Sequence, residues 1–228
     1  MIDAPERLNK LLALSLGVSR READELIASG DVKVNDSVVL LGARVSPTDE
    51  VTVKGKPISR STELIYLAFN KPVGYVCSRA SQGGVPTIYK LLPEAYHSLK
   101  TVGRLDKDSS GLILLTNDGD FAYQMTHPKF HKVKIYEVEL DRPLEPLHQQ
   151  MISDYGITLD DGVSKFELER LDDTRLTWRI TMSEGRNRQI RRTFTALGYT
   201  VTSLHRTVFG PYALGDIPSG EWKIIDIS

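Results

Sequence analysis

Two aspartates spaced two residues apart offer the clearest chemistry in the sequence. Asp106 and Asp108 lie between Gly103 and Gly111, and the apolar run that begins at Leu112 follows them. A glycine-bounded loop that leads into a buried strand holds its carboxylates on a rigid support while leaving them open to a ligand. The spacing is compatible with a metal site, with a glycosidase-like acid pair and with ordinary turn aspartates. Spacing alone does not distinguish these three.

A cluster of arginines lies in the last quarter of the chain, between Gly185 and Arg192. Arg188 stands at helical spacing from both Arg191 and Arg192, where like charges repel each other. An anionic partner would relieve that repulsion, which makes Arg186 and Arg188 candidates for ligand binding. The alternative is a set of solvated arginines.

A second basic pair, Arg20 and Arg21, falls in the first turn of an expected helix. Cations are disfavoured there, because the N-terminus of a helix carries a partial positive charge. Two arginines at that end indicate a phosphate held jointly by the side chains and the free backbone N–H groups. Solvation is again the alternative.

One aromatic residue could hold a ring-shaped ligand. Tyr136 shares a strand face with Val138 and Leu140. Its side chain could be a core tyrosine with its hydroxyl at the surface, or a platform on which a base stacks.

The elements that position these residues fall into two groups. In the first, Leu8, Leu11, Leu12 and Leu16 recur at helical spacing and predict a helix near residues 7–16 that ends at Gly17. A second helix follows, with Ser19 and Glu22 at capping-box spacing and with Gly30 placed to close it. Short strands are expected around Val32, Val34, Val38, Val39, Val51 and Val53, with a turn at Asn35 and Asp36.

The second group is mostly strands. Apolar runs at residues 64–69 and 112–115 predict buried strands, the first stopped by residues 70–72. Alternation around Tyr136 and from Leu176 to Met182 predicts two more, while Ile190, Phe194 and Leu197 mark a helix that Gly198 ends. The expected fold class is α+β with a mainly antiparallel sheet and a central cleft. We expect two domains, residues 1–60 and 61–228, with residues 54–57 and 59–63 as linker.

Composition narrows the class of protein. The 228 residues carry a formal net charge of −1, so a claim of nucleic-acid binding must rest on local clusters. Cys77 is the single cysteine, which excludes an internal disulfide and fits a reducing cytoplasm. Residues 1–6 lack the pattern of a targeting segment, and the sequence has no apolar run of membrane-spanning length. His127 and His131 lie four apart, but Pro128 between them argues against zinc.

The first 55 or so residues resemble a known RNA-binding module, first recognised in the fourth protein of the small ribosomal subunit. The resemblance is carried by the segments that begin at Arg7, Gly17 and Ile27. It implies that a structured RNA is faced by five basic residues: Arg7, Lys10, Arg20, Arg21 and Lys33.

The aspartate loop resembles the catalytic motif of bacterial ribosomal-RNA pseudouridine synthases. The match consists of residues 103–106, 110–112 and 116–119, which read GRLD, SGL and TNDG. It implies that Asp106, and not Asp108, is the nucleophile or base that acts on the ribose. Arg104 would then help to hold the flipped nucleotide.

Three further segments resemble the same family, in the same order along the chain. The segment KIYEV around Tyr136 resembles its second motif, which implies that this tyrosine stacks on the target uracil. The segment GRNRQIRR resembles its third motif, which implies that Arg191 pairs with Asp106 and keeps it ionised. Leu204 falls in a closing segment and would line the uracil pocket, although it also reads as a core residue.

The resemblance implies a cofactor-free uridine isomerase that acts on ribosomal RNA or an assembling ribosomal particle, as a monomer and away from membranes. Two alternatives remain at this point. One is a non-catalytic RNA-binding or ribosome-assembly protein with the same fold. The other is a hydrolase that uses Asp106 and Asp108 and releases a free base or sugar.

Overall fold

The computed structural model describes residues 4–60, 63–81 and 83–227. Within these ranges the chain divides into two compact units, residues 1–65 and 66–228. Residues 61 and 62 of the expected linker, and residues 1–3 of the segment searched for a targeting signal, lie outside the described residues. None of the described helices is long and apolar enough to cross a membrane.

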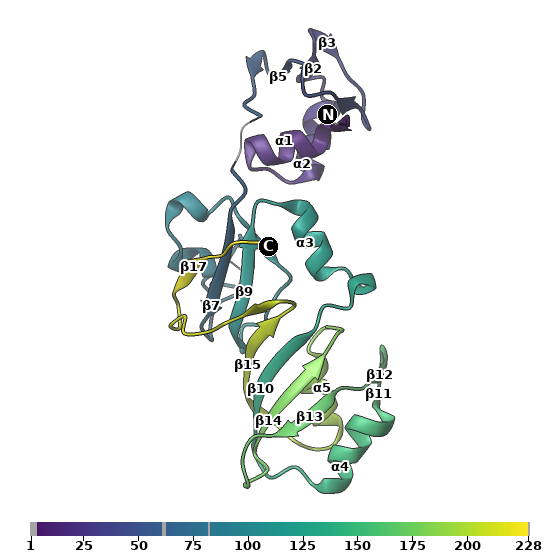
Figure 1. Cartoon of the computed structure of the whole chain (residues 1–228), viewed down its shortest axis with the longest axis vertical. Coiled ribbons are helices and arrows are strands. Elements are labelled where there is room, and N and C mark those ends of the chain that lie inside the picture. Colours follow the sequence, from purple (N-terminus) through teal and green to yellow (C-terminus); the bar gives the residue numbers. More distant parts are fainter. Residues whose placement is uncertain (1–3, 61–62, 82, 228) are drawn as a thin grey trace. The chain divides into compact units, whose positions relative to one another are not determined.

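The first unit begins with β1 (Glu6–Arg7) and two helices, α1 (Leu8–Leu16) and α2 (Arg20–Ala28), which Figure 1 draws in purple. Both helices are confirmed, and their ends follow the local chemistry. Gly17 closes α1 in the left-handed conformation, at φ 69°. Ser19 and Glu22 form the expected capping box, in which the Ser19 hydroxyl accepts a hydrogen bond from the Glu22 N–H at 3.1 Å.

A small sheet completes this unit. Its strand order is β3 (Ser37–Val38), β2 (Val32–Val34), β5 (Val51–Val53) and β6 (Lys56–Pro57), and β4 (Arg44–Val45) pairs separately with β1. Asn35 and Asp36 both have positive φ, which makes the tight turn between β2 and β3. The prediction of a linker at residues 54–57 is wrong. Lys54 and Gly55 make a second such turn, and β6 pairs back onto β5.

The core of the first unit joins the helices to the sheet. Its buried members come from both helices and three strands: Leu8, Leu11, Leu12, Ala23, Ile27, Val32, Val45 and Val51. Each expected apolar face therefore packs against the other elements of the unit, which is where most of the stability of such short helices comes from.

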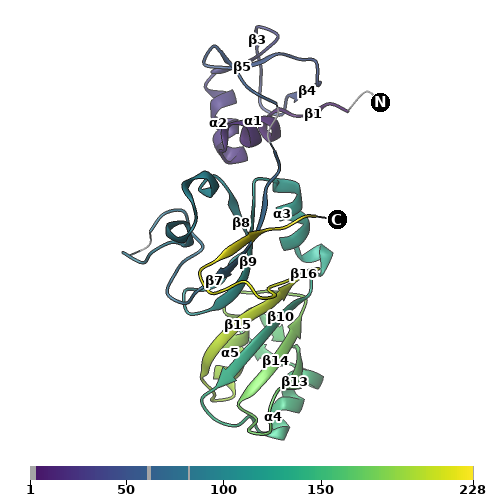
Figure 2. The same ribbon diagram turned by 60° about the vertical axis from the view of Figure 1, so that its left-hand side comes forward.

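The second unit is built on a nine-stranded sheet, shown from two sides in Figures 1 and 2. The main order is β13 (Glu167–Arg170), β14 (Thr177–Met182), β10 (Lys134–Leu140), β15 (Val201–Phe209), β9 (Ser110–Thr116), β7 (Tyr66–Lys71) and β17 (Trp222–Ile224). Two strands lie off this path: β8 (Lys100–Val102) on β9, and β16 (Tyr212–Ala213) on β15. The pairs are antiparallel except β15 with β9. The expected α+β class with a mainly antiparallel sheet is confirmed.

Helices and a hairpin flank this sheet. Near β8 and β9 lies α3 (Gly119–Thr126), followed by the 3-10 helix η3 (Pro128–Phe130). Around the other half lie α4 (Pro146–Gln150), the π-helical turn η4 (Met151–Tyr155), α5 (Gln189–Ala196) and the hairpin of β11 (Ile157–Leu159) and β12 (Gly162–Ser164), as Figures 1 and 2 show. Two further 3-10 helices, η1 (Ile88–Leu91) and η2 (Glu94–Tyr96), lie between β7 and β8.

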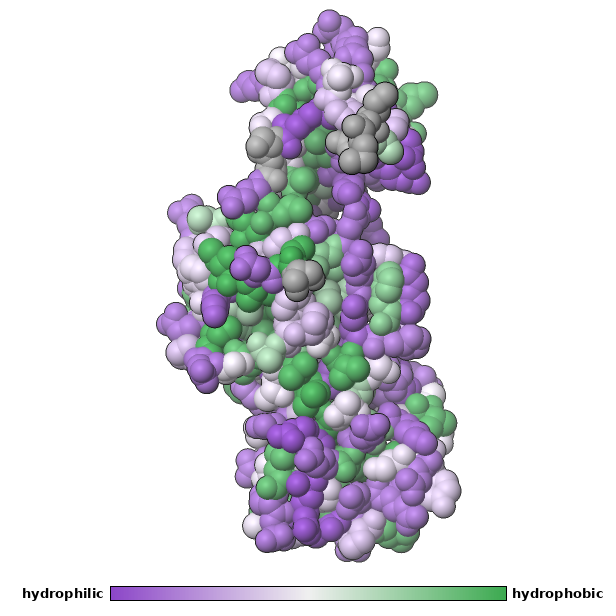
Figure 3. All heavy atoms as spheres, viewed as in Figure 1, coloured by the Kyte–Doolittle hydropathy of each residue, from purple (hydrophilic) through white to green (hydrophobic). Residues whose placement is uncertain are grey.

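The central strands β7 and β9 are buried along nearly their whole length, so both faces of this part of the sheet are covered. The first strand extends further than expected. Asn70 and Lys71 were predicted to stop it, but both lie within β7 and are buried, and Pro72 follows. On the face of the molecule seen in Figure 3, polar residues cover most of the surface, with apolar residues gathered midway along the second unit.

Candidate active site

A cavity of about 680 Å³ opens in the second unit, where β9, β15 and β10 are neighbours in the sheet. Its walls include the loop between β8 and β9, the strands β10 and β15, and the loop that precedes α5. The cavity brings together residues that the sequence analysis singled out from four separate segments: Arg104, Asp106, Tyr136, Arg186, Arg188 and Leu204. Arg191 lies on α5 and contacts the same β8–β9 loop.

A buried lysine fixes the backbone of the aspartate loop. The Lys71 side chain is fully buried, and its ammonium donates to the carbonyl oxygens of Asp106 at 3.0 Å, Ser109 at 2.6 Å and Pro72 at 3.1 Å. All three of its protons are thereby used, which a buried ammonium requires. Burial lowers the pKa of Lys71. Because Lys71 is part of β7, the strand directs its side chain beneath the aspartate loop.

Cys77 supports the other side of this loop. Its sulfur lies 3.5 Å from both the backbone nitrogen and the carbonyl oxygen of Leu105. Burial raises the pKa of the Cys77 thiol, so it stays protonated at neutral pH. Cys77 therefore packs against the loop and is not activated for reaction.

A close approach of two strands brings β15 up to the loop. Gly111 has φ 101°, and a Cβ there would lie 2.3 Å from the carbonyl oxygen of Arg206. Only glycine leaves room for this approach. The parallel pairing of β9 with β15 therefore depends on Gly111, and it places Leu204 and Arg206 beside the aspartate loop.

Tyr136 and Leu204 form the apolar part of the cavity wall. Tyr136 lies on β10 opposite Arg206 of β15, and it is 8% exposed. Leu204 lies opposite Val138 in the same register and is 7% exposed. Both side chains belong to the core and line the cavity, so the core and ligand alternatives raised from sequence are both compatible with their positions.

The two aspartates of the loop have different partners. Both oxygens of Asp108 accept hydrogen bonds from the Arg188 guanidinium at 2.9 Å, and Arg191 Nε lies 3.3 Å from Asp108 Oδ2. Asp106 Oδ2 lies 3.7 Å from Arg188 Nη1. The ion pair expected between Asp106 and Arg191 is therefore formed by Arg188, while Arg191 pairs with Asp108. The hydrogen bonds from Arg188 lower the pKa of Asp108.

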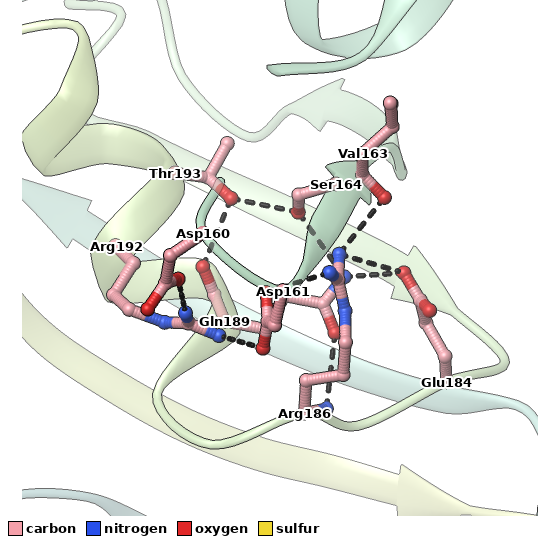
Figure 4. A network of polar contacts seen from close by, with 9 residues as sticks. All are labelled: Asp160, Asp161, Val163, Ser164, Glu184, Arg186, Gln189, Arg192 and Thr193. Atoms are coloured by element: carbon pink, nitrogen blue, oxygen red, sulfur yellow. Dashed lines mark hydrogen bonds and ion pairs between the residues drawn. The ribbon is translucent and has the colours of Figure 1, made fainter. Parts of the chain in front are cut away.

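The segment around α5 is held by a network of polar contacts with the β11–β12 hairpin, shown in Figure 4. Arg186 Nη1 lies 2.8 Å from Asp161 Oδ1, and Arg186 Nη2 donates to the Val163 carbonyl at 2.8 Å. Arg192 forms ion pairs with Asp160 and, at 2.6 Å, with Asp161. The arginine cluster thus divides into two pairs: Arg186 and Arg192 hold the hairpin, and the other two hold Asp108.

Buried polar side chains lie beneath this network. Thr193 Oγ1 donates to Ser164 Oγ at 2.7 Å and is shared with the Gln189 carbonyl at 2.9 Å. Gln189 Nε2 donates to Ser164 Oγ at 3.1 Å and to Glu184, and Gln189 Oε1 accepts from the Arg186 N–H at 3.1 Å. These contacts fix the first turn of α5, and with it the loop that borders the cavity.

Two cations in the cavity wall were not assigned a role from sequence, although Lys134 stands in the segment KIYEV and Arg206 lies two residues after Leu204. Arg206 is 2% exposed, donates through Nε to the Leu112 carbonyl at 2.8 Å and lies 4.7 Å from the centre of the Phe209 ring. Lys134 Nζ lies 5.5 Å from the same ring. Burial and the charge of Arg206 lower the pKa of Lys134. The sequence did not predict this pair, because its two members lie on different strands, β10 and β15, that become neighbours only in the folded sheet.

The histidine pair singled out from the sequence lies at the 3-10 helix η3. His127 and His131 border the cavity at the two ends of η3, with His131 in the left-handed conformation. Among the described residues, no group of three or more histidines, cysteines or acids is placed to hold a metal ion.

The basic residues expected to face RNA in the first unit lie on its helices and strands. Arg7 precedes α1, Arg20 and Arg21 open α2, and these three side chains are exposed. Lys10 is half-buried on α1, and Lys33 is exposed on β2. The sequence thus placed the arginines correctly in the first turn of α2.

Comparison with known proteins agrees with both units. A family model described as RNA pseudouridylate synthase matches residues 65–196, and an S4 domain model matches residues 6–51. The chain is 39% identical over 223 residues to ribosomal small subunit pseudouridine synthase A of Pasteurella multocida, covering 95% of this chain and 94% of that protein. It is 37% identical over 225 residues to ribosomal large subunit pseudouridine synthase B of Bacillus subtilis, covering 95% and 90%.

A solved structure matches over the same extent. A crystal structure of a pseudouridylate synthase superposes with a TM-score of 0.68 at 34% identity and covers 96% of each chain. The sequence resemblance is therefore confirmed: with a matching model over more than half of its length and relatives that align almost end to end, this chain belongs to the RNA pseudouridylate synthase family.

Proposed function

We propose that this protein isomerises a uridine of ribosomal RNA to pseudouridine, with Asp106 as its catalytic carboxylate. One observation carries the proposal: a single cavity is lined by Asp106, by the ring of Tyr136 and by Leu204, which come from three strands or loops far apart in the sequence. The named relatives are a ribosomal small subunit and a ribosomal large subunit pseudouridine synthase, and both align with this chain over 95% of its length.

The reaction needs the target uridine outside its stack, since a stacked base cannot reach a protein carboxylate. In the proposed reaction, the base first packs against Tyr136 and Leu204, and Arg104 at the loop holds the nucleotide. Asp106 attacks carbon one of the ribose or removes a proton from the sugar. The bond between N1 of uracil and the ribose breaks, and uracil turns. Carbon five then bonds to the ribose, and at this step the bond to Asp106 breaks or the proton taken from the sugar returns to it. Carbon five loses its proton and N1 gains one, so the product is an isomer.

The protein's contribution is position and charge. The reaction exchanges one bond to the ribose for another within a single substrate, without a change in oxidation state. Uracil carries negative charge when its bond to the ribose breaks. Lys134 and Arg206 in the cavity wall, and Arg188 at its edge, are cations that would stabilise this charge, and burial strengthens such an interaction.

We further propose that the first unit binds the RNA and the second performs the chemistry, with the functional boundary near residue 60. Arg7, Lys10, Arg20, Arg21 and Lys33 would contact RNA phosphates from the first unit. Arg186 and Arg188 would do so from the second, and this requires that the ligand share Arg186 with Asp161 and Arg188 with Asp108. Because ribosomal RNA is transcribed and assembled in the bacterial cytoplasm, we place the activity there, with the protein acting as a monomer.

The test is an assay with ribosomal RNA tritiated at carbon five of uracil. Isomerisation releases tritium and leaves the RNA chain and its bases attached. Release of free base would indicate a hydrolase instead, and binding without release of either would indicate a non-catalytic RNA-binding protein. RNA from cells that lack the protein is the required substrate, because its target uridine is unmodified.

A control variant keeps the test specific. Asp173 forms a surface ion pair with Arg170, and its side chain is fully exposed, so Asp173→Asn should release tritium at the wild-type rate. Loss of activity in this variant would mean that the assay responds to any change of surface charge.

A further inference from the structure

We infer that Asp108 is a positioning residue of this active site: its carboxylate is the counter-ion that fixes Arg188 and Arg191 beside the cavity, so that Asp106 remains available to react. The inference rests on the proposed role of Asp106. It goes beyond the family resemblance, which assigns catalysis to the first aspartate of the loop and leaves the second without a function.

Asp108 makes more and shorter contacts with arginines than Asp106 does. Arg188 donates to both of its carboxylate oxygens at 2.9 Å, which is the planar, two-point arrangement in which guanidinium and carboxylate bind most strongly. Arg191 adds Nε at 3.3 Å from the carboxylate and donates through Nη2 to the Asp108 carbonyl at 2.7 Å. Side chain and backbone of one residue therefore hold two arginines that stand 80 and 83 positions away.

These arginines need a counter-ion at this place. Arg188 is the residue that caps the start of α5, Arg191 lies in its first turn, and the N-terminus of a helix is itself positive. Arg188 also has φ 47°, a left-handed conformation that is disfavoured for a residue with a Cβ. Repulsion and backbone strain both oppose the observed position of Arg188. The two hydrogen bonds to Asp108 offset them.

Without Asp108, the nearest described carboxylate in the loop is that of Asp106. It already lies 3.7 Å from Arg188 Nη1, the same nitrogen that donates to Asp108 Oδ1 at 2.9 Å. A small rotation of the guanidinium would therefore transfer it from one aspartate to the other. A carboxylate whose oxygens are engaged by a guanidinium is a weaker nucleophile and base, because the lone pairs that must react are occupied.

The rest of the loop does not depend on this carboxylate. Lys71 binds the carbonyl oxygens of Asp106 and Ser109, and Ser109 Oγ lies 3.4 Å from Arg191. Replacing the Asp108 side chain thus leaves the backbone of the loop anchored from below. The effect of a substitution should appear in the arginines and in the reaction, with the fold intact.

The first experiment compares Asp108→Asn, Asp108→Glu and the wild type in tritium release under single-turnover conditions, with protein in saturating excess over RNA. We expect Asp108→Asn to lower the maximal rate between roughly tenfold and a hundredfold, with the Kd for RNA within about threefold of wild type, and Asp108→Glu to recover part of the rate. The matched control is Glu169→Gln, which removes a surface carboxylate that pairs with Arg179 at 2.8 Å outside the cavity. It should react at the wild-type rate.

The second experiment distinguishes positioning from a merely structural role by a double-mutant cycle. If Asp108 acts through Arg188, Asp108→Asn should cost less than about threefold in an Arg188→Ala background, because the arginine that would engage Asp106 is gone. An equal cost in both backgrounds would overturn the inference, as would full activity of Asp108→Asn. A wild-type protein that releases no tritium would instead contradict the proposed function itself.

Discussion

Two turns of the second unit carry aspartates that bind the same arginine-rich segment. They differ in whether one of their carboxylates is left without a close guanidinium partner. The turn between β11 and β12 presents Asp160 and Asp161 to Arg186 and Arg192. The loop between β8 and β9 presents two aspartates to the other two arginines, but Asp108 takes the close contacts. Asp106 is left with one guanidinium nitrogen at 3.7 Å, and it lines the cavity.

The two turns divide their carboxylates differently between holding the structure and taking part in the chemistry. In the hairpin turn both carboxylates are engaged by guanidinium groups, so it fastens α5 to the hairpin (Figure 4). In the aspartate loop, the carboxylate of Asp108 binds the arginines, and the carboxylate of Asp106 has no close partner. A reactive carboxylate needs arginines nearby for its surroundings but must not be fully bound by them.

Removing one aspartate from each turn should produce the largest difference between them. We expect Asp106→Asn to lower tritium release by a factor on the order of 10³ or more, because the amide is neither a nucleophile nor a base. RNA affinity should be nearly unchanged. Asp160→Asn in the hairpin turn should keep most of the activity. Residual turnover in Asp106→Asn comparable to that of Asp160→Asn would remove Asp106 from its proposed role.

A second change tests whether the hairpin side is structural. Thr193→Val keeps the shape of a fully buried residue but removes the hydrogen bond to Ser164 Oγ. Loss of one buried partner should lower the free energy of unfolding by about 1 to 3 kcal/mol. For a chain of this size that is a fall in Tm of several degrees, seen by calorimetry. Below the transition the rate of isomerisation should stay near that of wild type. A fall in rate without a fall in Tm would place this network in the reaction.

A third test contrasts arginines that already hold carboxylates with arginines expected to hold RNA. Replacing Arg20 and Arg21 together with alanine should weaken RNA binding roughly tenfold at low salt. It should also reduce the slope of log Kd against log salt by about two. Binding releases about one counter-ion for each phosphate contact, and the double variant loses two such contacts. Arg192→Ala should leave that slope nearly unchanged, because Asp160 and Asp161 already neutralise Arg192. Equal slopes for the double variant and the wild type would favour solvated arginines on α2.

The smallest expected effect is a pH dependence on the side of the aspartate loop. His205 of β15 shares a hydrogen bond of 2.9 Å with Ser110, and burial lowers the pKa of His205 below its usual 6.5. The unfolded chain therefore binds a proton more readily than the folded one, so this histidine stabilises the fold above pH 6.5 and that stability is lost as the pH falls through its folded pKa. We expect Tm to decrease between pH 7 and pH 5, and His205→Gln to reduce the decrease. An identical pH profile in the variant would contradict this assignment.

The sequence predicted the local elements well where a local rule was complete. The capping box at Ser19, the glycine that ends α1 and the turn at Asn35 each depend on residues within a few positions of one another. The failures have equally local causes. The segment from Lys54 to Pro57 contains the residue types of a linker, and the same types also make a two-residue hairpin turn. Which of the two forms depends on whether β5 offers an edge for pairing.

The candidate site was predictable residue by residue only in part. Motif resemblance placed Asp106, Tyr136 and Leu204 together, and the structure brings these three to one cavity. It did not predict that Arg188 would reach Asp106, that Asp108 would hold two arginines, or that Lys71 would support the loop from beneath. Those contacts join residues 35 to 83 positions apart, and the spacing of residues within a helix or strand does not predict such contacts.

The chemical groups of this chain and the short segments that form helices and turns follow from its sequence, because side-chain identity and backbone propensity are local properties. The fold, in contrast, sets which of the two aspartates has no close partner and which arginines face the cavity. Partners are chosen by distance and direction, and these exist only once β9 lies against β15 and α5 is fastened to its hairpin.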